Sequence, residues 1–427
     1  MSIHIESSPQ EESFEGPEKN LQVIFNKIYY DTGTLRSISQ ERWQEMLNYA
    51  KCKILTTMEN EKWTSYILSE SSLFVYDDRI ILKTCGVTPL LNALDDIILI
   101  GKELNLKPAA VLYWRKNFSN PHLQNPIHQK FENEVSFLDE HLGGDSRTAI
   151  LGPEEKDHFY FYYCELLPKE EFNPVFNTFE LKMHEIHPNK SENFFWEKGT
   201  IRPESLNEVY EKLPGYKIDE FFFEPCGYSM NGINEGNYET IHVTPEGSCS
   251  YISFETNDEK YINTINKEFK IMEIFKPFCC STIQIKKGND IVDNFKDVNN
   301  RNFSLVSTDF ATLGNINVEF HSYETNEMHL RGCCWRLAGA AGVALGSAFT
   351  GASGFDSCCF STFFSFFFST FATISFSSIF CLGGVKNTTM MPATHAAAIH
   401  GHTIWVRFCF FSCATRCISR AFRSAGI

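Results

Sequence analysis

Short apolar runs bounded by polar residues recur along most of the chain. Several span three to five positions and are rich in β-branched and aromatic residues, which is typical of strands. The predicted strands are residues 23–25, 66–68, 73–76, 79–82, 159–163, 240–244 and 250–254. Residues 40–47 and 89–94 instead place apolar side chains at helical spacing. Ser39 is predicted to cap the first helix, and Pro89 suits the opening turn of the second.

Runs of strands with helices between them favour an α+β sandwich over a doubly wound parallel sheet. The sequence contains neither a GxGxxG motif nor a P-loop, so the usual nucleotide-binding loops are absent. No internal repeat recurs at a fixed period. We therefore predict one large sheet domain rather than an array of small units.

The two ends of the chain differ from this pattern. Residues 1–12 are polar and acidic, which predicts a disordered leader rather than a signal peptide. Residues 326–427 form an atypical tail, rich in Phe, Ser, Cys and Ala, in which residues 357–382 carry no charge and are long enough to cross a bilayer. Their Phe/Ser/Thr/Cys mixture is what a translated pyrimidine-rich tract would give. We favour a mis-predicted exon or read-through segment, with a membrane segment and an ordered appendage as alternatives.

Charge and cysteine content differ between the tail and the rest of the chain. The net charge is -15; the six basic residues and one acidic residue from Gly332 onward give the tail +5, so the preceding part carries -20. That balance argues against a nucleic-acid partner and suits a cationic ligand, or simply a soluble acidic protein. Eight of the 15 cysteines lie in the tail, and the other seven show no CxxC spacing. We expect a reduced, cytoplasmic protein.

A Glu70-Ser71-Ser72 triplet lies between two strand-like runs, in YILSESSLFV at residues 66–75, and KTCG follows at 83–86. Taken alone, a serine at a strand junction is usually a plain hydroxyl and Cys85 a small buried hydrophobe. Likewise His242, between Ile241 and Val243, would most often be a packed strand histidine. The remaining unusual blocks are FEGPEK at 14–19, PCGYSMNG at 225–232, TIHVTPE at 240–246 and SYISFETN at 250–257.

These blocks, in their order along the chain, closely resemble those of the eukaryotic S-adenosylmethionine decarboxylase proenzymes. The resemblance predicts a domain of residues 13–325. The resemblance implies a four-layer αββα sandwich of two antiparallel sheets flanked by helices. Members of that family cut their own backbone between a glutamate and a serine, here Glu70 and Ser71. The serine becomes a pyruvoyl group at the start of the large chain, so neither a metal nor pyridoxal phosphate is implied.

The resemblance also assigns roles to individual residues. The pyruvoyl group from Ser71 would form a Schiff base with the substrate amine, with Cys85 as proton donor and Ser229 and His242 serving the self-processing reaction. Glu15 and Glu18 are further catalytic candidates. The residues implied in substrate binding are Phe14 and Phe223 on the adenine, Glu246 on the ribose hydroxyls, and Leu68 and Glu70.

The diamine site of the family is only partly retained. Family forms that putrescine stimulates carry a buried acidic cluster, of which this chain keeps Thr178, Glu180 and Glu255. Phe176 and Gln22 stand where acids are expected, and losing two carboxylates would weaken diamine binding by several kcal/mol at a dry site. We expect putrescine to be at most a weak activator. Glu224 also replaces a usual Asn, and no effect is predicted for it.

The predicted function is conversion of S-adenosylmethionine to its decarboxylated form and CO2 for spermidine and spermine biosynthesis, by a homodimer of processed small and large chains. An alternative is a catalytically weak paralogue that regulates an active decarboxylase. The presence of Ser71, Cys85, Ser229, His242 and Glu246 argues against that alternative. A membrane-anchored enzyme is a second alternative and depends wholly on the tail.

Overall fold

The structure is a computed structural model that describes residues 15–27, 33–168, 171, 176–196, 206–207, 215–246, 250–259, 266–287 and 302–326. All of these residues belong to one compact unit. The predicted leader, Phe14 and the tail beyond residue 326 lie outside the described residues.

In the part of the chain that the structure describes, two antiparallel sheets of eight strands each form the centre. The first sheet contains β1 (Lys19–Lys27), β2 (Ile54–Glu59), β3 (Thr64–Leu68), β4 (Ser71–Val75), β5 (Arg79–Thr84), β6 (Leu106–Lys116), β7 (Asp145–Leu151) and β8 (Phe159–Glu165). The second contains β9 (Asn177–Ile186), β10 (Lys217–Phe222), β11 (Tyr228–Asn234), β12 (Asn237–Thr244), β13 (Tyr251–Thr256), β14 (Pro277–Lys287), β15 (Phe303–Leu313) and β16 (Ile316–Thr325).

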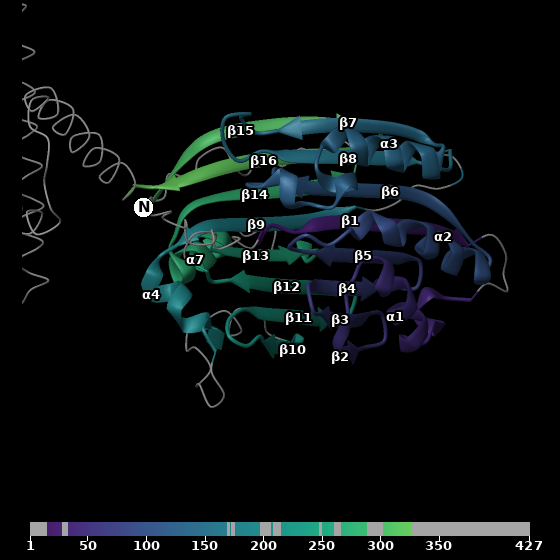
Figure 1. Cartoon of the computed structure of the whole chain (residues 1–427), viewed down its shortest axis with the longest axis horizontal. Helices are drawn as coiled ribbons and strands as arrows, with labels where there is room; N and C mark the ends of the chain where they lie inside the picture. Colours follow the sequence, from purple (N-terminus) through teal and green to yellow (C-terminus); the bar gives the residue numbers. More distant parts are fainter. Residues whose placement is uncertain are drawn as a thin grey trace, which may run out of the picture. The chain divides into compact units, whose positions relative to one another are not determined.

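The second sheet repeats the topology of the first. The spatial orders are β2-β3-β4-β5-β1-β6-β8-β7 and β10-β11-β12-β13-β9-β14-β16-β15, so each strand of the first sheet corresponds to the strand eight places later in the chain. Figure 1 shows the corresponding strands at matching levels, from β7 and β15 at the top to β2 and β10 at the bottom. This repeat left no periodic sequence signal.

Helices cover the outer face of each sheet. Helices α1 (Gln40–Tyr49), α2 (Leu94–Glu103) and α3 (Phe131–Leu142) contribute Trp43, Ile97 and Leu138 to one apolar cluster with the first sheet. On the second sheet, α7 (Asn266–Phe275) packs Met272 and Phe275 against the strands, near the short helix α4 (Pro188–Ser191). The layers are therefore α, β, β and α, which confirms the predicted sandwich.

The layer between the sheets is apolar at its sides and polar in its middle. One apolar cluster includes Leu112 and Phe320, and another includes Trp63 and Phe74. Between them lie fully buried polar side chains from both sheets, among them Ser72, Lys83, Glu180, Lys182, Asn231, Thr240, Ser253 and Glu255. A polar interior of this kind costs stability unless its groups are paired, so it points to chemistry between the sheets.

Most of the predicted elements are present. Each predicted strand lies within β1, β3, β4, β5, β8, β12 or β13, apart from one residue at the edge of β4 and of β13. Ser39 caps α1 as predicted, because its hydroxyl accepts a hydrogen bond from the backbone N–H of Arg42. The helix predicted at residues 89–94 begins as a 3-10 turn, Leu90–Ala93, and continues as α2 to Glu103.

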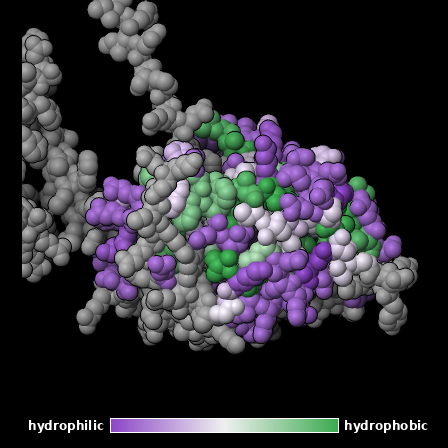
Figure 2. All heavy atoms as spheres, turned by 90° about the horizontal axis from the view of Figure 1, so that it is seen from below, coloured by the Kyte–Doolittle hydropathy of each residue, from purple (hydrophilic) through white to green (hydrophobic). Residues whose placement is uncertain are grey.

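No helix among the described residues is long and apolar enough to span a bilayer. The surface seen from the edge that carries β2 and β10 is largely hydrophilic, with small hydrophobic groups between the polar side chains (Figure 2). Residues 357–382, the predicted membrane segment, lie outside the described residues.

Candidate active site

The Glu70–Ser71 bond lies where a tight hairpin turn enters β4. Ser69 and Glu70 form the two-residue turn, since Leu68 of β3 pairs directly with Ser71 of β4. Two-residue hairpins usually place Gly or Asn at positions of positive φ. Here Ser71 itself takes a φ of 134°, in the region that favours glycine. The backbone is therefore strained at the predicted cleavage site.

Cys85 lies directly against this bond. It follows β5, whose Thr84 pairs with Ser71, and its backbone N–H donates to the carbonyl oxygen of Glu70 at 2.9 Å. The Cys85 thiol donates to the same oxygen at 3.2 Å. Burial, together with the nearby Glu70 carboxylate, raises the pKa of the Cys85 thiol well above its ordinary value. Cys85 thus keeps its proton and offers two donors to one carbonyl.

His242 lies on the adjacent wall, on β12. Its Nδ1 is 2.8 Å from the hydroxyl of Ser229 on the neighbouring strand β11. Its Nε2 is 2.9 Å from the Thr240 hydroxyl and 3.2 Å from that of Ser72. Burial lowers the pKa of His242 to about 4, although the Glu18 carboxylate opposes this shift. The imidazole is therefore neutral near pH 7 and able to accept a proton.

These side chains line one cavity of about 260 Å³. Seven predicted site residues contribute to its wall: Glu70, Ser71, Cys85, Phe223, Ser229, His242 and Glu246. Two polar atoms there are buried without a hydrogen-bond partner among the described residues, namely the Ser71 Oγ and the Glu246 Oε2. Unpaired polar atoms in a cavity wall are costly, so they mark positions where a reacting group or ligand would make the missing contact.

Glu18 lies behind the cavity, in the polar middle of the sandwich. It accepts a hydrogen bond from the Tyr251 hydroxyl at 2.5 Å, another from Ser253, and lies 3.5 Å from the Lys182 Nζ. Burial opposes its ionisation, but Lys182 and Lys83 outweigh that effect and lower the pKa of Glu18 to about 2. Its fixed charge acts on His242 from a distance rather than by contact.

The acids of the predicted diamine site are already paired. Lys83, fully buried, binds Glu180 at 3.1 Å and also forms an ion pair with Glu255. Glu180 further accepts the Trp114 Nε1–H at 2.9 Å, and Glu255 accepts the Tyr238 hydroxyl at 2.6 Å. Thr178, on β9, and Phe176, just before β9, are both buried.

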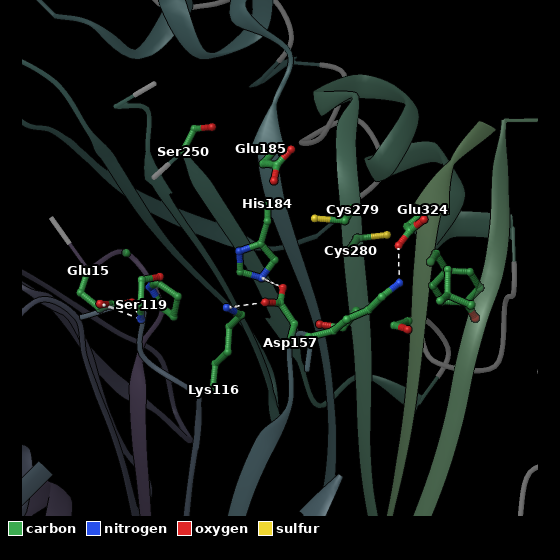
Figure 3. A pocket seen from close by; sticks show the side chains of 17 residues that line it. Glu15, Lys116, Ser119, Asp157, His184, Glu185, Ser250, Cys279, Cys280 and Glu324 are labelled. Atoms are coloured by element: carbon green, nitrogen blue, oxygen red, sulfur yellow. Dashed lines mark hydrogen bonds and ion pairs between the residues drawn. The ribbon is translucent and has the colours of Figure 1, made fainter. Parts of the chain in front are cut away.

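Glu15 and Leu68 do not line the cavity. Leu68 is buried in the apolar cluster beneath the helices. The Glu15 carboxylate accepts the backbone N–H groups of Ser119 and Asn120 at 3.0 to 3.2 Å and faces a separate cavity of about 400 Å³. In that cavity Asp157 binds Lys116 and lies 3.7 Å from His184 (Figure 3). It contains neither Ser71, Cys85 nor His242, so the smaller cavity is the candidate active site.

Three residues that the sequence did not single out hold His242 in place: Ser72, Asn231 and Thr240. Ser72 donates to the Asn231 Oδ1 at 2.7 Å as well as contacting His242. Asn231 and Thr240 each lie two residues from a predicted site residue, Ser229 and His242. Residues two apart on a strand share a face, so this spacing was an available signal. Among the described residues there is no cluster of His, Cys, Asp or Glu arranged to hold a metal ion.

Comparisons with known proteins agree with this arrangement. A family model described as adenosylmethionine decarboxylase matches residues 11–329. The S-adenosylmethionine decarboxylase proenzyme of Dictyostelium discoideum is 37% identical over 284 residues, covering 64% of this chain and 74% of that protein. The proenzyme of Xenopus laevis is 32% identical over 321 residues, covering 73% and 95%.

Among solved structures, the AdoMetDC-delta26 monomer of Trypanosoma brucei has a TM-score of 0.47 and 23% identity, covering 60% of this chain and 99% of that one. The family match covers both sheets and the whole candidate site. Together with relatives above 30% identity that are matched over most of their length, it settles the family. The chain belongs to the adenosylmethionine decarboxylase family.

Proposed function

We propose that this protein cleaves its own backbone between Glu70 and Ser71 and then decarboxylates S-adenosylmethionine. One observation carries the proposal. The Glu70 carbonyl accepts two hydrogen bonds from Cys85, while the adjacent Ser71 has a strained φ and a buried hydroxyl that no described residue hydrogen-bonds. A purely structural serine would satisfy its hydroxyl and would leave this conformation to glycine.

The cleavage would use groups of this chain alone. The Ser71 Oγ adds to the carbonyl carbon of Glu70, the peptide C–N bond breaks, and an ester with a free amine at residue 71 results. The negative oxygen that forms during addition lies where the N–H and S–H of Cys85 already donate. Donors fixed in advance at a developing oxyanion lower such barriers by about 3 to 4 kcal/mol each in the best cases.

The second stage needs a base. Removal of the α-proton of residue 71 eliminates the Glu70 carboxylate and leaves dehydroalanine, which takes up water and releases ammonia to leave a keto group. His242 supports this role because it is neutral, buried and lines the same cavity as Ser71. Ser229 on its Nδ1 side would orient the ring.

The residues around Ser71 also suit the mature enzyme. A pyruvoyl group at residue 71 supplies a carbonyl that withdraws electrons as CO2 is lost. Cys85, a protonated thiol beside that position, would return a proton to the product. Phe223 offers an aromatic face for the adenine, and the unpaired Glu246 Oε2 offers an acceptor for the ribose hydroxyls.

Putrescine would have little effect on this protein. Glu180 and Glu255 both pair with Lys83, and Glu180 pairs with Lys182 as well, while Phe176 and Gln22 supply no further carboxylate. A diamine would therefore have to displace buried ion pairs to bind there. Cleavage and decarboxylation are expected to change less than about twofold with saturating putrescine.

The processed chains would form a homodimer in the cytoplasm. The outer strands β7 and β15 expose apolar side chains, with Ile150 50% and Phe310 45% exposed, as an edge that pairs with a second copy would. The cysteines of the described residues are free thiols, as expected in a reducing compartment.

Release of CO2 from carboxyl-labelled S-adenosylmethionine tests the proposed activity. The purified protein should release label, and the Ser71→Ala variant, folded but uncleaved, should release none. If the wild-type protein is folded and silent in this assay, the decarboxylase proposal fails and a regulatory partner role takes its place.

A further inference from the structure

Ser72, the residue immediately after the cleavage serine, contacts both Asn231 and His242. Its side chain is fully buried between the sheets, with the hydroxyl 2.7 Å from the Asn231 Oδ1 and 3.2 Å from the His242 Nε2. The three residues lie on β4, β11 and β12, so both sheets contribute to the arrangement. No role follows for Ser72 from the cleavage chemistry itself.

Counting donors fixes the direction of these bonds. A serine hydroxyl has one proton, and Ser72 gives it to the Asn231 carbonyl oxygen, which can only accept. Toward His242 the Ser72 oxygen therefore presents only lone pairs. The contact at Nε2 is favourable only if Nε2 carries the imidazole proton, which it then shares between Ser72 and Thr240.

The other ring nitrogen must then be the basic one. In a neutral imidazole one nitrogen bears a proton and the other a lone pair. With the proton on Nε2, the lone pair is on Nδ1, which accepts the Ser229 hydroxyl at 2.8 Å. This order of bonds runs without conflict from Asn231 through Ser72 and His242 to Ser229.

We propose that Ser72 and Asn231 are positioning residues that hold His242 in the tautomer whose basic nitrogen, Nδ1, faces Ser229. This inference rests on the proposed function, since it concerns the base of the self-cleavage reaction. It adds that the base acts from the Ser229 side of the ring, so Ser229 either turns aside or relays the proton when the α-proton of residue 71 is removed.

The tautomer can be measured without any activity. In the uncleaved Ser71→Ala variant, the nitrogen chemical shifts and couplings of ¹⁵N-labelled His242 report which nitrogen carries the proton. The proposal requires a proton on Nε2 and a bare Nδ1. A proton on Nδ1 would overturn it, because Ser72 would then be donating to the ring rather than to Asn231.

Variants test the two positioning residues. Asn231→Leu removes the acceptor and frees Ser72 to donate to Nε2, so the proton should move to Nδ1 and self-cleavage should slow by about tenfold to 10⁴-fold. Ser72→Ala should leave a mixture of tautomers and slow cleavage at least about tenfold, whereas Ser72→Thr, which keeps the hydroxyl, should retain both the tautomer and the rate.

The outcomes separate the inference from the function on which it rests. Each variant is first checked for a native amide spectrum, and the His242 signal is read in the Ser71→Ala background. If wild-type protein cleaves but Ser72→Ala and Asn231→Leu change neither tautomer nor rate, the inference is wrong and the proposed function stands. If wild-type protein does not cleave, the proposed function fails whichever tautomer is found.

Discussion

Cys85 makes two contacts with the bond that the proposed reaction breaks, and they predict a double defect when its thiol is removed. In Cys85→Ala the backbone N–H still donates to Glu70, so self-cleavage should slow by up to about 100-fold rather than stop. Decarboxylation by the chains that do form should fall much further, because the variant lacks the proposed proton donor. A time course of cleavage after cell-free synthesis, followed by CO2 release, measures both.

A matched control for this variant is Cys164→Ala. Cys164 is buried in the apolar cluster under the helices and takes no part in the cavity. Cleavage and activity close to wild type are expected for it. Equal losses in Cys85→Ala and Cys164→Ala would mean that the defect reflects packing, and the role proposed for Cys85 would be wrong.

At the residue scale the sequence predicted seven of the residues in the cavity wall, and it missed the residues behind the wall. Ser71, Cys85, Ser229 and His242 were predicted because they lie in sequence blocks that resemble the decarboxylase family, and the fold brings them together. Ser72, Asn231 and Thr240 act through hydrogen bonds between strands far apart in the chain. Such contacts depend on strand pairing and sheet packing, which local patterns do not specify.

Lys83 joins elements of both sheets, since it extends from β5 to Glu180 on β9 and Glu255 on β13. Lys83→Met would leave Glu255 without its cation and Glu180 with Lys182 alone, and breaking a buried ion pair in this way costs about 3 to 5 kcal/mol. Urea unfolding of this variant, made in the Ser71→Ala background so that one species is present, measures the change in unfolding free energy.

The surface pair between Lys156 and Glu324 supplies the comparison. Its Lys156 side chain is 54% exposed, so Lys156→Met should cost less than about 1 kcal/mol. If Lys83→Met were no more damaging than Lys156→Met, the buried network would not be what holds the two sheets together at their centre.

Elements with clear patterns were predicted well, and those whose exposure is irregular were not. Strands β3 and β4 are buried along their whole length, and each contains three consecutive apolar or aromatic residues by which it was recognised from sequence. The edge strand β15 alternates irregularly between buried and exposed positions, and β7 is mostly exposed. Neither gives the regular period on which strand prediction depends, because an edge strand is only partly covered by its neighbours.

At the scale of the whole molecule, the polar layer between the sheets predicts sensitivity to acid. Burial lowers the pKa of His242 to about 4 and that of His184 to about 3. Below the ordinary histidine pKa of about 6.5, these two histidines bind protons in the unfolded chain but stay neutral in the folded chain. Their contribution therefore leaves stability full above pH 6.5 and lowers it as the pH drops. Glu18, with a pKa lowered to about 2, adds a further loss below about pH 4.5.

Between pH 6.5 and pH 5 the loss in free energy of unfolding amounts to roughly 2 kcal/mol for each of the two histidines. Urea unfolding of Ser71→Ala at pH 7, 6 and 5 checks it, and His184→Phe should flatten the dependence in part. Burial raises the pKa of Glu255 to about 8, which adds stability as the pH falls and opposes the histidines, so the difference between the two proteins is the test. An equal pH dependence with and without His184→Phe would contradict the assignment of a neutral His184.

The repeated topology of the two sheets is the feature of the whole molecule that the sequence hid most completely. Corresponding strands such as β4 and β12 share a place in the sheet order but carry different site residues, the predicted cleavage serine Ser71 on one and His242 on the other. The family's blocks predicted two sheets, and only the strand order shows that the second repeats the first.

The central claim is that the chain breaks once, between Glu70 and Ser71, and that residue 71 becomes a keto group. Intact-mass measurement of the purified protein under denaturing conditions tests it directly. We predict two chains, one ending at Glu70 and one beginning with a blocked pyruvoyl residue at position 71, and a single full-length chain for Ser71→Ala. A single uncut chain from folded wild-type protein would contradict the account.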